Sequence, residues 1–148
     1  MQTFEDFIEF AIKREEEAIK AYGDIAGIAK TPGLKKLLLD LQGEERNHKE
    51  LLQNITEEKI ESLKIKEVTD LKISDYLIEE PPSPEMNFQD LLILAAKKEQ
   101  KAVDLYSDLE RKVSRKELKK LFAFLIQQEK SHKLKLEEEY EKHVLEGY

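Results

Sequence analysis

Two short segments of the sequence combine a glutamate and a histidine three residues apart. They run from Glu45 to His48 and from Glu129 to His132, and the second lies 84 residues after the first. On a helix, residues three apart lie on one face about one turn from each other, so a carboxylate and an imidazole at this spacing can bind the same metal ion. The chain has only three histidines, and two of them recur in this motif. The pattern therefore indicates metal-binding chemistry.

The residues around each motif follow the period of an amphipathic helix. Over residues 4–29 and 34–55, apolar side chains recur at alternating spacings of four and three, which is the pattern of a packed helix seam. Glu15, Glu45 and His48 occupy seam positions, where an apolar core residue is expected. The sequence thus predicts that these three polar side chains are buried.

The second half of the chain repeats the first after a shift of 84 residues, which is twelve heptads. Glu99 and Glu129 stand where Glu15 and Glu45 stand in the first half, whereas the acids next to them are not repeated as acids. The comparison selects one acid from each helix. The predicted metal ligands are therefore Glu15, Glu45, His48, Glu99, Glu129 and His132.

The repeat predicts an all-α fold in which two helical hairpins form a four-helix bundle within one domain, residues 1–148. The predicted helices cover residues 3–29, 32–55, 87–113 and 115–144, with Thr31 and Ser114 as N-caps of the second and fourth. A long crossover over residues 56–86 joins the second helix to the third. In it we expect β-rich pieces over residues 60–73 and a helical turn over residues 74–78, packed against the bundle. Because the glutamates lie at similar distances from the two hairpin turns, they should meet at one level.

Four carboxylates at one buried level need compensation, since a buried ion that lacks a counter-charge costs several kcal/mol. The seams contain no Arg or Lys, which leaves protonation or bound cations. Two divalent cations would balance the four negative charges, and carboxylates with one imidazole per metal suit iron or manganese better than zinc. Tyr22 and Tyr106 lie seven residues after Glu15 and Glu99 on the same seam. They either hydrogen-bond the carboxylates or simply pack in the core.

Composition argues against several other classes of protein. The net charge is −7 and no basic cluster occurs, which argues against a nucleic-acid partner. The absence of Cys excludes disulfides, thiolate zinc sites and iron–sulfur clusters. The first residues do not resemble a signal peptide and no apolar run is long enough to span a membrane, so we expect a cytoplasmic protein without a membrane partner. We expect Phe7, Phe10 and Ile12 to be exposed and to favour a homodimer.

The segments from Glu15 to Tyr22 and from Glu99 to Tyr106 both read E-x-x-A-x-x-x-Y. Together with the two E-x-x-H segments, they resemble the rubrerythrin-like branch of the ferritin superfamily over all four predicted helices. The resemblance implies a ferritin-like bundle with a non-haem di-iron centre that reacts with peroxide or oxygen. It further implies that the second glutamate of each hairpin bridges the metals, that the first is a terminal ligand, and that each histidine binds one metal.

Two features depart from the family pattern. Full-length rubrerythrins usually add a rubredoxin-like iron–cysteine domain that supplies electrons, and a chain without Cys requires a separate protein or small-molecule donor. Rubrerythrins also tend to carry an additional Glu where this chain has Ala102, which places their redox-linked ligand switch in question. Three functions stay open: peroxide reduction or oxygen-dependent Fe(II) oxidation, iron storage in a large assembly, and an interaction bundle whose metal site is structural.

Overall fold

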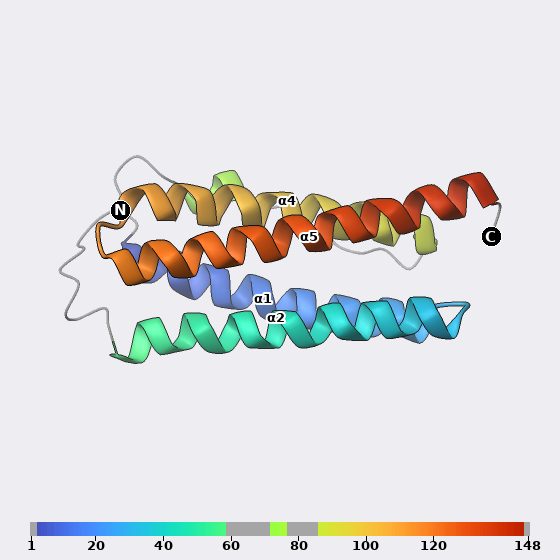
Figure 1. Ribbon diagram of the computed structural model, residues 1–148, viewed down its shortest axis with the longest axis horizontal. Coiled ribbons are helices and arrows are strands. Elements are labelled where there is room, and N and C mark those ends of the chain that lie inside the picture. Colours follow the sequence, from blue (N-terminus) through green and yellow to red (C-terminus); the bar gives the residue numbers. More distant parts are fainter. Residues whose placement is uncertain (1–2, 59–71, 77–85, 147–148) are drawn as a thin grey trace. The chain divides into compact units, whose positions relative to one another are not determined.

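The computed structural model describes residues 3–58, 72–76 and 86–146 (Figure 1). It contains the helices α1 (Phe4–Gly27), α2 (Pro32–Glu58), α4 (Phe88–Lys112) and α5 (Lys116–Glu146), and the 3₁₀ helix η1 (Ile73–Tyr76). Each α-helix ends within three residues of its predicted limits, and η1 overlaps the predicted helical turn. The expected β-rich pieces fall outside the described residues except at positions 72 and 73, and 73 already belongs to η1. No strand occurs in the described ranges.

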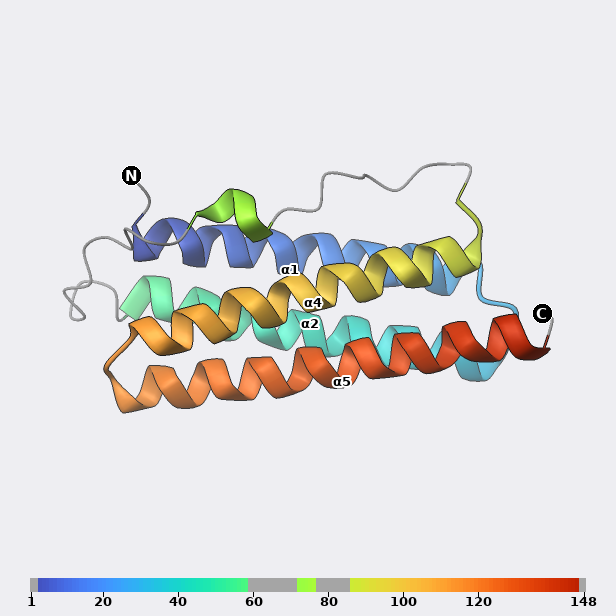
Figure 2. The ribbon, with the colours of Figure 1, turned by 90° about the horizontal axis from the view of Figure 1, so that it is seen from above.

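The chain divides into two compact units, Met1–Asp75 and Tyr76–Tyr148. In the first unit α1 packs against α2, and in the second α4 packs against α5. Each pair is an antiparallel hairpin, as the ribbon shows from two directions (Figures 1 and 2). The two predicted hairpins are thus both present. No described helix is both long enough and apolar enough to cross a membrane.

The first helix of each hairpin begins with the same kind of cap. At the start of α1, the Thr3 hydroxyl accepts a hydrogen bond from the Asp6 backbone N–H at 3.0 Å, and the Asp6 carboxylate accepts one from the Thr3 N–H at 2.9 Å. At the start of α4, Asn87 and Asp90 make the same reciprocal pair at 2.9 and 3.3 Å. These capping boxes satisfy N–H groups that have no partner inside the helix. They are 84 residues apart, so they fix α1 and α4 in the same register.

The second helix of each hairpin also starts in this register. The Thr31 hydroxyl accepts a hydrogen bond from the Leu34 N–H at 3.2 Å, which confirms Thr31 as the N-cap of α2. The prediction of Ser114 for α5 is wrong, because that helix begins two residues later and the Arg115 carbonyl accepts from the Lys119 N–H. Thr31 and Arg115 are 84 residues apart. Serine is a favourable N-cap residue, but α5 begins at the position that corresponds to the start of α2 in the repeat.

The predicted seams form the core of each hairpin. The buried apolar seam residues are Phe4, Ile8, Ala11, Ala18, Tyr22 and Ile25 on α1, Leu34, Leu38, Leu41, Leu52 and Ile55 on α2, Leu92, Ala95, Ala102, Tyr106 and Leu109 on α4, and Leu118, Phe122, Leu125 and Leu136 on α5. The expectation that Phe7 is exposed is wrong, since its exposed fraction is 0%. Phe10 and Ile12 are half-buried. The helices therefore bury a wider stripe than the seam alone. The exposed apolar surface that was expected to favour a homodimer is smaller than predicted.

The 3₁₀ helix η1 is anchored to the second hairpin. Tyr76 is buried, and its hydroxyl donates a hydrogen bond to the Asp108 carboxylate on α4 at 2.7 Å. The expectation that the crossover packs against helices is met at this one described point. The remaining apolar residues of the crossover lie outside the described residues, apart from the half-buried Ile73 and Met86.

Candidate metal centre

The first hairpin brings three of the predicted ligands together. Glu15 on α1 and Glu45 and His48 on α2 have exposed fractions of 0 to 1%. His48 Nδ1 lies 3.6 Å from a Glu15 carboxylate oxygen and 3.7 Å from a Glu45 oxygen. One donor atom from each residue falls within 4.8 Å of the other two. We call these residues the first triad.

The second hairpin repeats this arrangement with Glu99 on α4 and Glu129 and His132 on α5. All three are buried, with exposed fractions of 0 to 1%. His132 Nδ1 lies 3.6 Å from a Glu99 oxygen and 3.4 Å from a Glu129 oxygen. The donor atoms again fall within 4.8 Å of one another. This second triad thus reproduces the first to within a few tenths of an ångström.

The donor atoms of each triad fit a single metal ion. Two ligands that each lie about 2.1 Å from one ion, at an angle of roughly 110–125°, are about 3.4 to 3.7 Å apart. The four measured nitrogen–oxygen distances span this range. Two carboxylates and one imidazole also form a donor set that suits iron or manganese. The residues of each triad therefore form a donor set that fits a metal site.

The predicted tyrosines are buried beside the triads. Tyr22 and Tyr106 have exposed fractions of 1% and 0%, and each lies two turns along its helix from the glutamate of α1 or α4. The ring of Tyr106 stacks on Phe122, with 6.2 Å between the ring centres and 23° between the planes. This contact accounts for the packing of Tyr106. The hydrogen bond from either tyrosine to a ligand carboxylate stays a prediction.

Arg14 is a neighbour of the first triad that the sequence reasoning missed. Its exposed fraction is 7%, and its guanidinium lies 3.7 Å from a Glu15 carboxylate oxygen. The seam pattern could not reveal it, because Arg14 lies one position off the seam and a long side chain is needed to reach the carboxylate. The corresponding residue of the second hairpin is Lys98, which is half-buried. The first triad therefore has an arginine beside it, whereas the second half of the chain carries a lysine at the corresponding position.

The acids that the repeat did not select lie outside the triads. Glu16, Glu17, Glu137 and Glu138 are exposed, and Glu44 is half-buried. Comparison of the two halves of the sequence therefore separated the buried candidate ligands from acids that are exposed or half-buried, without any structural information.

Comparison with known proteins places the chain in a family. The sequence model of rubrerythrin matches residues 6–140. The chain belongs to the rubrerythrin family. Among curated proteins, none matches this rubrerythrin-family chain.

Two solved structures resemble this rubrerythrin-family protein over most of its length. A hypothetical protein from Pyrococcus furiosus has a TM-score of 0.76 and 27% identity, over 95% of this chain and 89% of its own. A protein from Thermotoga maritima, described as a ferritin-like diiron-carboxylate protein, has a TM-score of 0.82 and 22% identity, over 95% of this chain and 96% of its own. The likeness confirms the predicted fold class, an all-α ferritin-like four-helix bundle. The family and the buried triads together fit a di-iron site.

Proposed function

We propose that the protein is a non-haem di-iron carboxylate redox protein whose two ions would be held by the residues of the first and the second triad. The observation that carries the proposal is the duplicate set of buried donors, two carboxylates and one imidazole in each hairpin. Glu15, Glu45 and His48 would hold one ion, and Glu99, Glu129 and His132 would hold the other. This assignment follows the arrangement of ferritin-like di-iron proteins, in which two helices give one Glu each and two give Glu-x-x-His.

Charge supports two divalent ions rather than one. Four ionised carboxylates carry −4, and two divalent cations balance them. The Arg14 guanidinium beside Glu15 adds one positive charge on the side of the first triad. This charge would offset part of the attraction between the first triad and its ion. Iron is the metal favoured by the family, and manganese fits the same donors.

The proposed reaction is the reduction of hydrogen peroxide, or the oxidation of Fe(II) by oxygen. Two ferrous ions bound at the centre would supply the two electrons that, with two protons, convert peroxide to two waters. The protein side chains hold the donors in place and exclude bulk water, which their low exposure supports. Tyr22 and Tyr106 would orient ligand carboxylates by hydrogen bonding. Ala18 and Ala102 are small buried residues one turn from the α1 and α4 glutamates and leave room for a small substrate.

The electrons must come from outside these 148 residues, which contain no Cys to hold an iron–sulfur or rubredoxin-type centre. A separate redox protein or a small reductant would serve. We retain the homodimer as the expected assembly and the cytoplasm as the expected compartment.

Metal analysis of anaerobically purified protein tests the proposal. We expect about two irons per chain, and a new absorption from oxo-bridged Fe(III) when peroxide is added. Glu45→Gln should lower both the iron content and the peroxide turnover. Glu44→Gln is the matched control, because it makes the same change one residue away at a position where the repeat already has Gln128. A wild-type protein that takes up no metal, or an unchanged metal content in Glu45→Gln, would refute the di-iron centre.

Two further measurements separate the alternatives. A large assembly by light scattering would favour iron storage, whereas a monomer or dimer excludes it. A melting temperature that does not change on addition of Fe(II) would favour an interaction bundle, because any ligand that binds only the native state raises the melting temperature.

A further inference from the structure

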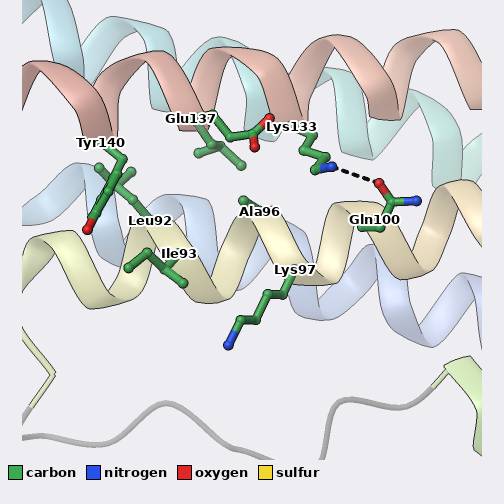
Figure 3. Close-up of a pocket in the computed structure, with 9 residues that line it drawn as sticks. Leu92, Ile93, Ala96, Lys97, Gln100, Lys133, Glu137 and Tyr140 are labelled. Atoms are coloured by element: carbon green, nitrogen blue, oxygen red, sulfur yellow. Dashed lines mark hydrogen bonds between the residues drawn. The ribbon is translucent and has the colours of Figure 1, made fainter.

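The second hairpin contains a pocket between α4 and α5 whose lining includes none of the predicted metal ligands (Figure 3). Its volume is about 390 Å³, which is within the range of small-molecule sites. The floor is formed by the side chains of Leu92 and Leu136, both with an exposed fraction of 0%. Ala96 lies at the centre of the pocket and leaves it open. The floor is therefore apolar and reaches the core of the hairpin.

The two ends of the pocket differ in polarity. Ile93 and the ring of Tyr140 lie at one end (Figure 3). At the other end Lys133 on α5 donates a hydrogen bond from Nζ to the Gln100 side-chain oxygen on α4 at 2.8 Å. The separation along α4 from Leu92 to Gln100 is eight residues, or about 12 Å of helix. The pocket thus has an apolar end and a polar end about 12 Å apart.

Three charged side chains line the pocket. Lys97 and Lys133 are positive and Glu137 is negative. Lys97 extends away from α5, and the Glu137 carboxylate lies on α5 on the side of Lys133 (Figure 3). Lys133 is half-buried, so its ammonium group is less completely hydrated than that of a surface lysine. A carboxylate at the polar end would meet Lys133 and the amide of Gln100.

The first hairpin does not repeat this pocket in its sequence. The residues 84 positions earlier are Ile12 in place of Ala96, Glu9 in place of Ile93, and Thr56 in place of Tyr140. An isoleucine at the central position would fill the space that Ala96 leaves open. The apolar end is likewise replaced by polar residues. The duplicated ligands are conserved between the halves while this pocket is specific to the second half.

We propose that this pocket binds a medium-chain aliphatic carboxylate. The hydrocarbon chain lies on Leu92 and Leu136 with its end against Tyr140, and the carboxylate lies beside Lys133. An apolar body contributes affinity by burial of its surface, and one charged contact sets the orientation. An eight-carbon chain has about the length of the pocket. The binding does not depend on the metal centre.

The test uses octanoate as the probe and the full-length protein with metal removed by a chelator. Isothermal calorimetry gives the dissociation constant, and methyl NMR reports whether the Leu92 and Leu136 signals shift. Ala96→Ile, which copies the residue of the first hairpin, should weaken octanoate binding at least ten-fold. Ala123→Ile is the matched control, because Ala123 is exposed on α5 outside the pocket. It should leave the dissociation constant unchanged.

A second comparison tests the polar end. Lys133→Met should weaken octanoate binding several-fold while leaving the binding of octanol unchanged, and octylamine should not bind. The proposal is overturned if octanoate leaves the Leu92 and Leu136 signals unshifted at saturating concentration, or if Ala96→Ile and Ala123→Ile bind it equally. If Ala96→Ile changes the molar mass of the protein in solution, the pocket is instead a contact site for a second copy of the chain, and the proposal is overturned. Because no metal is present, none of these results depends on the di-iron centre.

Discussion

Replacing Glu45 with glutamine should stabilise the metal-free protein while it weakens metal binding. Glutamine has the same shape as glutamate but carries no charge, so the substitution leaves no cavity. In the metal-free protein, Glu45 and Glu15 bring two buried carboxylates within 4.8 Å of each other. Clustered ligand carboxylates lower the stability of the protein when no metal is bound, whereas a residue that serves only packing does not lower it.

The size of the effect follows from the distance between the two carboxylates. At 4.8 Å and an effective dielectric constant of about 20, two unit negative charges repel each other by about 3.5 kcal/mol. The Arg14 guanidinium near Glu15 reduces this value. We therefore expect a gain of about 1 to 3 kcal/mol for Glu45→Gln. For a chain of this length each kcal/mol raises the melting temperature by roughly 2 to 4 °C, so the expected shift is about +5 °C.

Differential scanning calorimetry with a chelator and then with Fe(II) under anaerobic conditions measures both halves of the prediction. Wild-type protein at a metal concentration about 100 times the dissociation constant should gain about 2.7 kcal/mol for each bound ion, and Glu45→Gln should gain much less. Glu44→Gln, on the half-buried neighbour, should change neither value by more than about 0.5 kcal/mol. A metal-free Glu45→Gln protein that melts below wild type would refute the reasoning, because Glu45 would then contribute to the fold rather than to a strained ligand set.

Three other substitutions test separate parts of the structure. His132→Ala should reduce the iron content from about two to about one per chain, measured by elemental analysis, because it removes the only imidazole of the second triad. Phe122→Ala should destabilise the protein by about 3 to 5 kcal/mol in chemical denaturation, since this ring is fully buried and stacks on Tyr106; Phe122→Leu, the residue type at the repeated position, should cost clearly less. Tyr76→Phe should cost about 1 kcal/mol in the same assay through loss of the hydrogen bond to Asp108, and no measurable loss would mean that this contact does not anchor η1.

The core and the triads could be predicted from the sequence because both follow periodic rules. A seam spacing of four and three gives the buried face of a helix, and a polar residue on that face must also be buried. The 84-residue repeat then separated Glu15 and Glu45 from the acids beside them. The structure finds both residues fully buried and within reach of His48.

Features that depend on side-chain length or on competition between local signals could not be predicted in this way. Arg14 reaches a ligand carboxylate from a position beside the seam, and no periodic rule reports how far a flexible side chain extends. Phe7 lies beside the seam and is buried because the packed stripe is wider than two positions per heptad. Ser114 has a strong intrinsic preference for capping, but the helix begins where its partner in the repeat begins. The meeting of the two triads in one centre depends on contacts between hairpins and stays a prediction.

The repeated helix starts have a consequence for how the length of this chain can vary. Glu15 and Glu99 each lie twelve residues after their N-cap, and Glu45 and Glu129 each lie fourteen residues after Thr31 and Arg115. One inserted residue within any of these four stretches would turn the glutamate by about 100° away from its triad. Insertions and deletions should therefore be tolerated in the hairpin turns and the crossover, and excluded between each cap and its ligand.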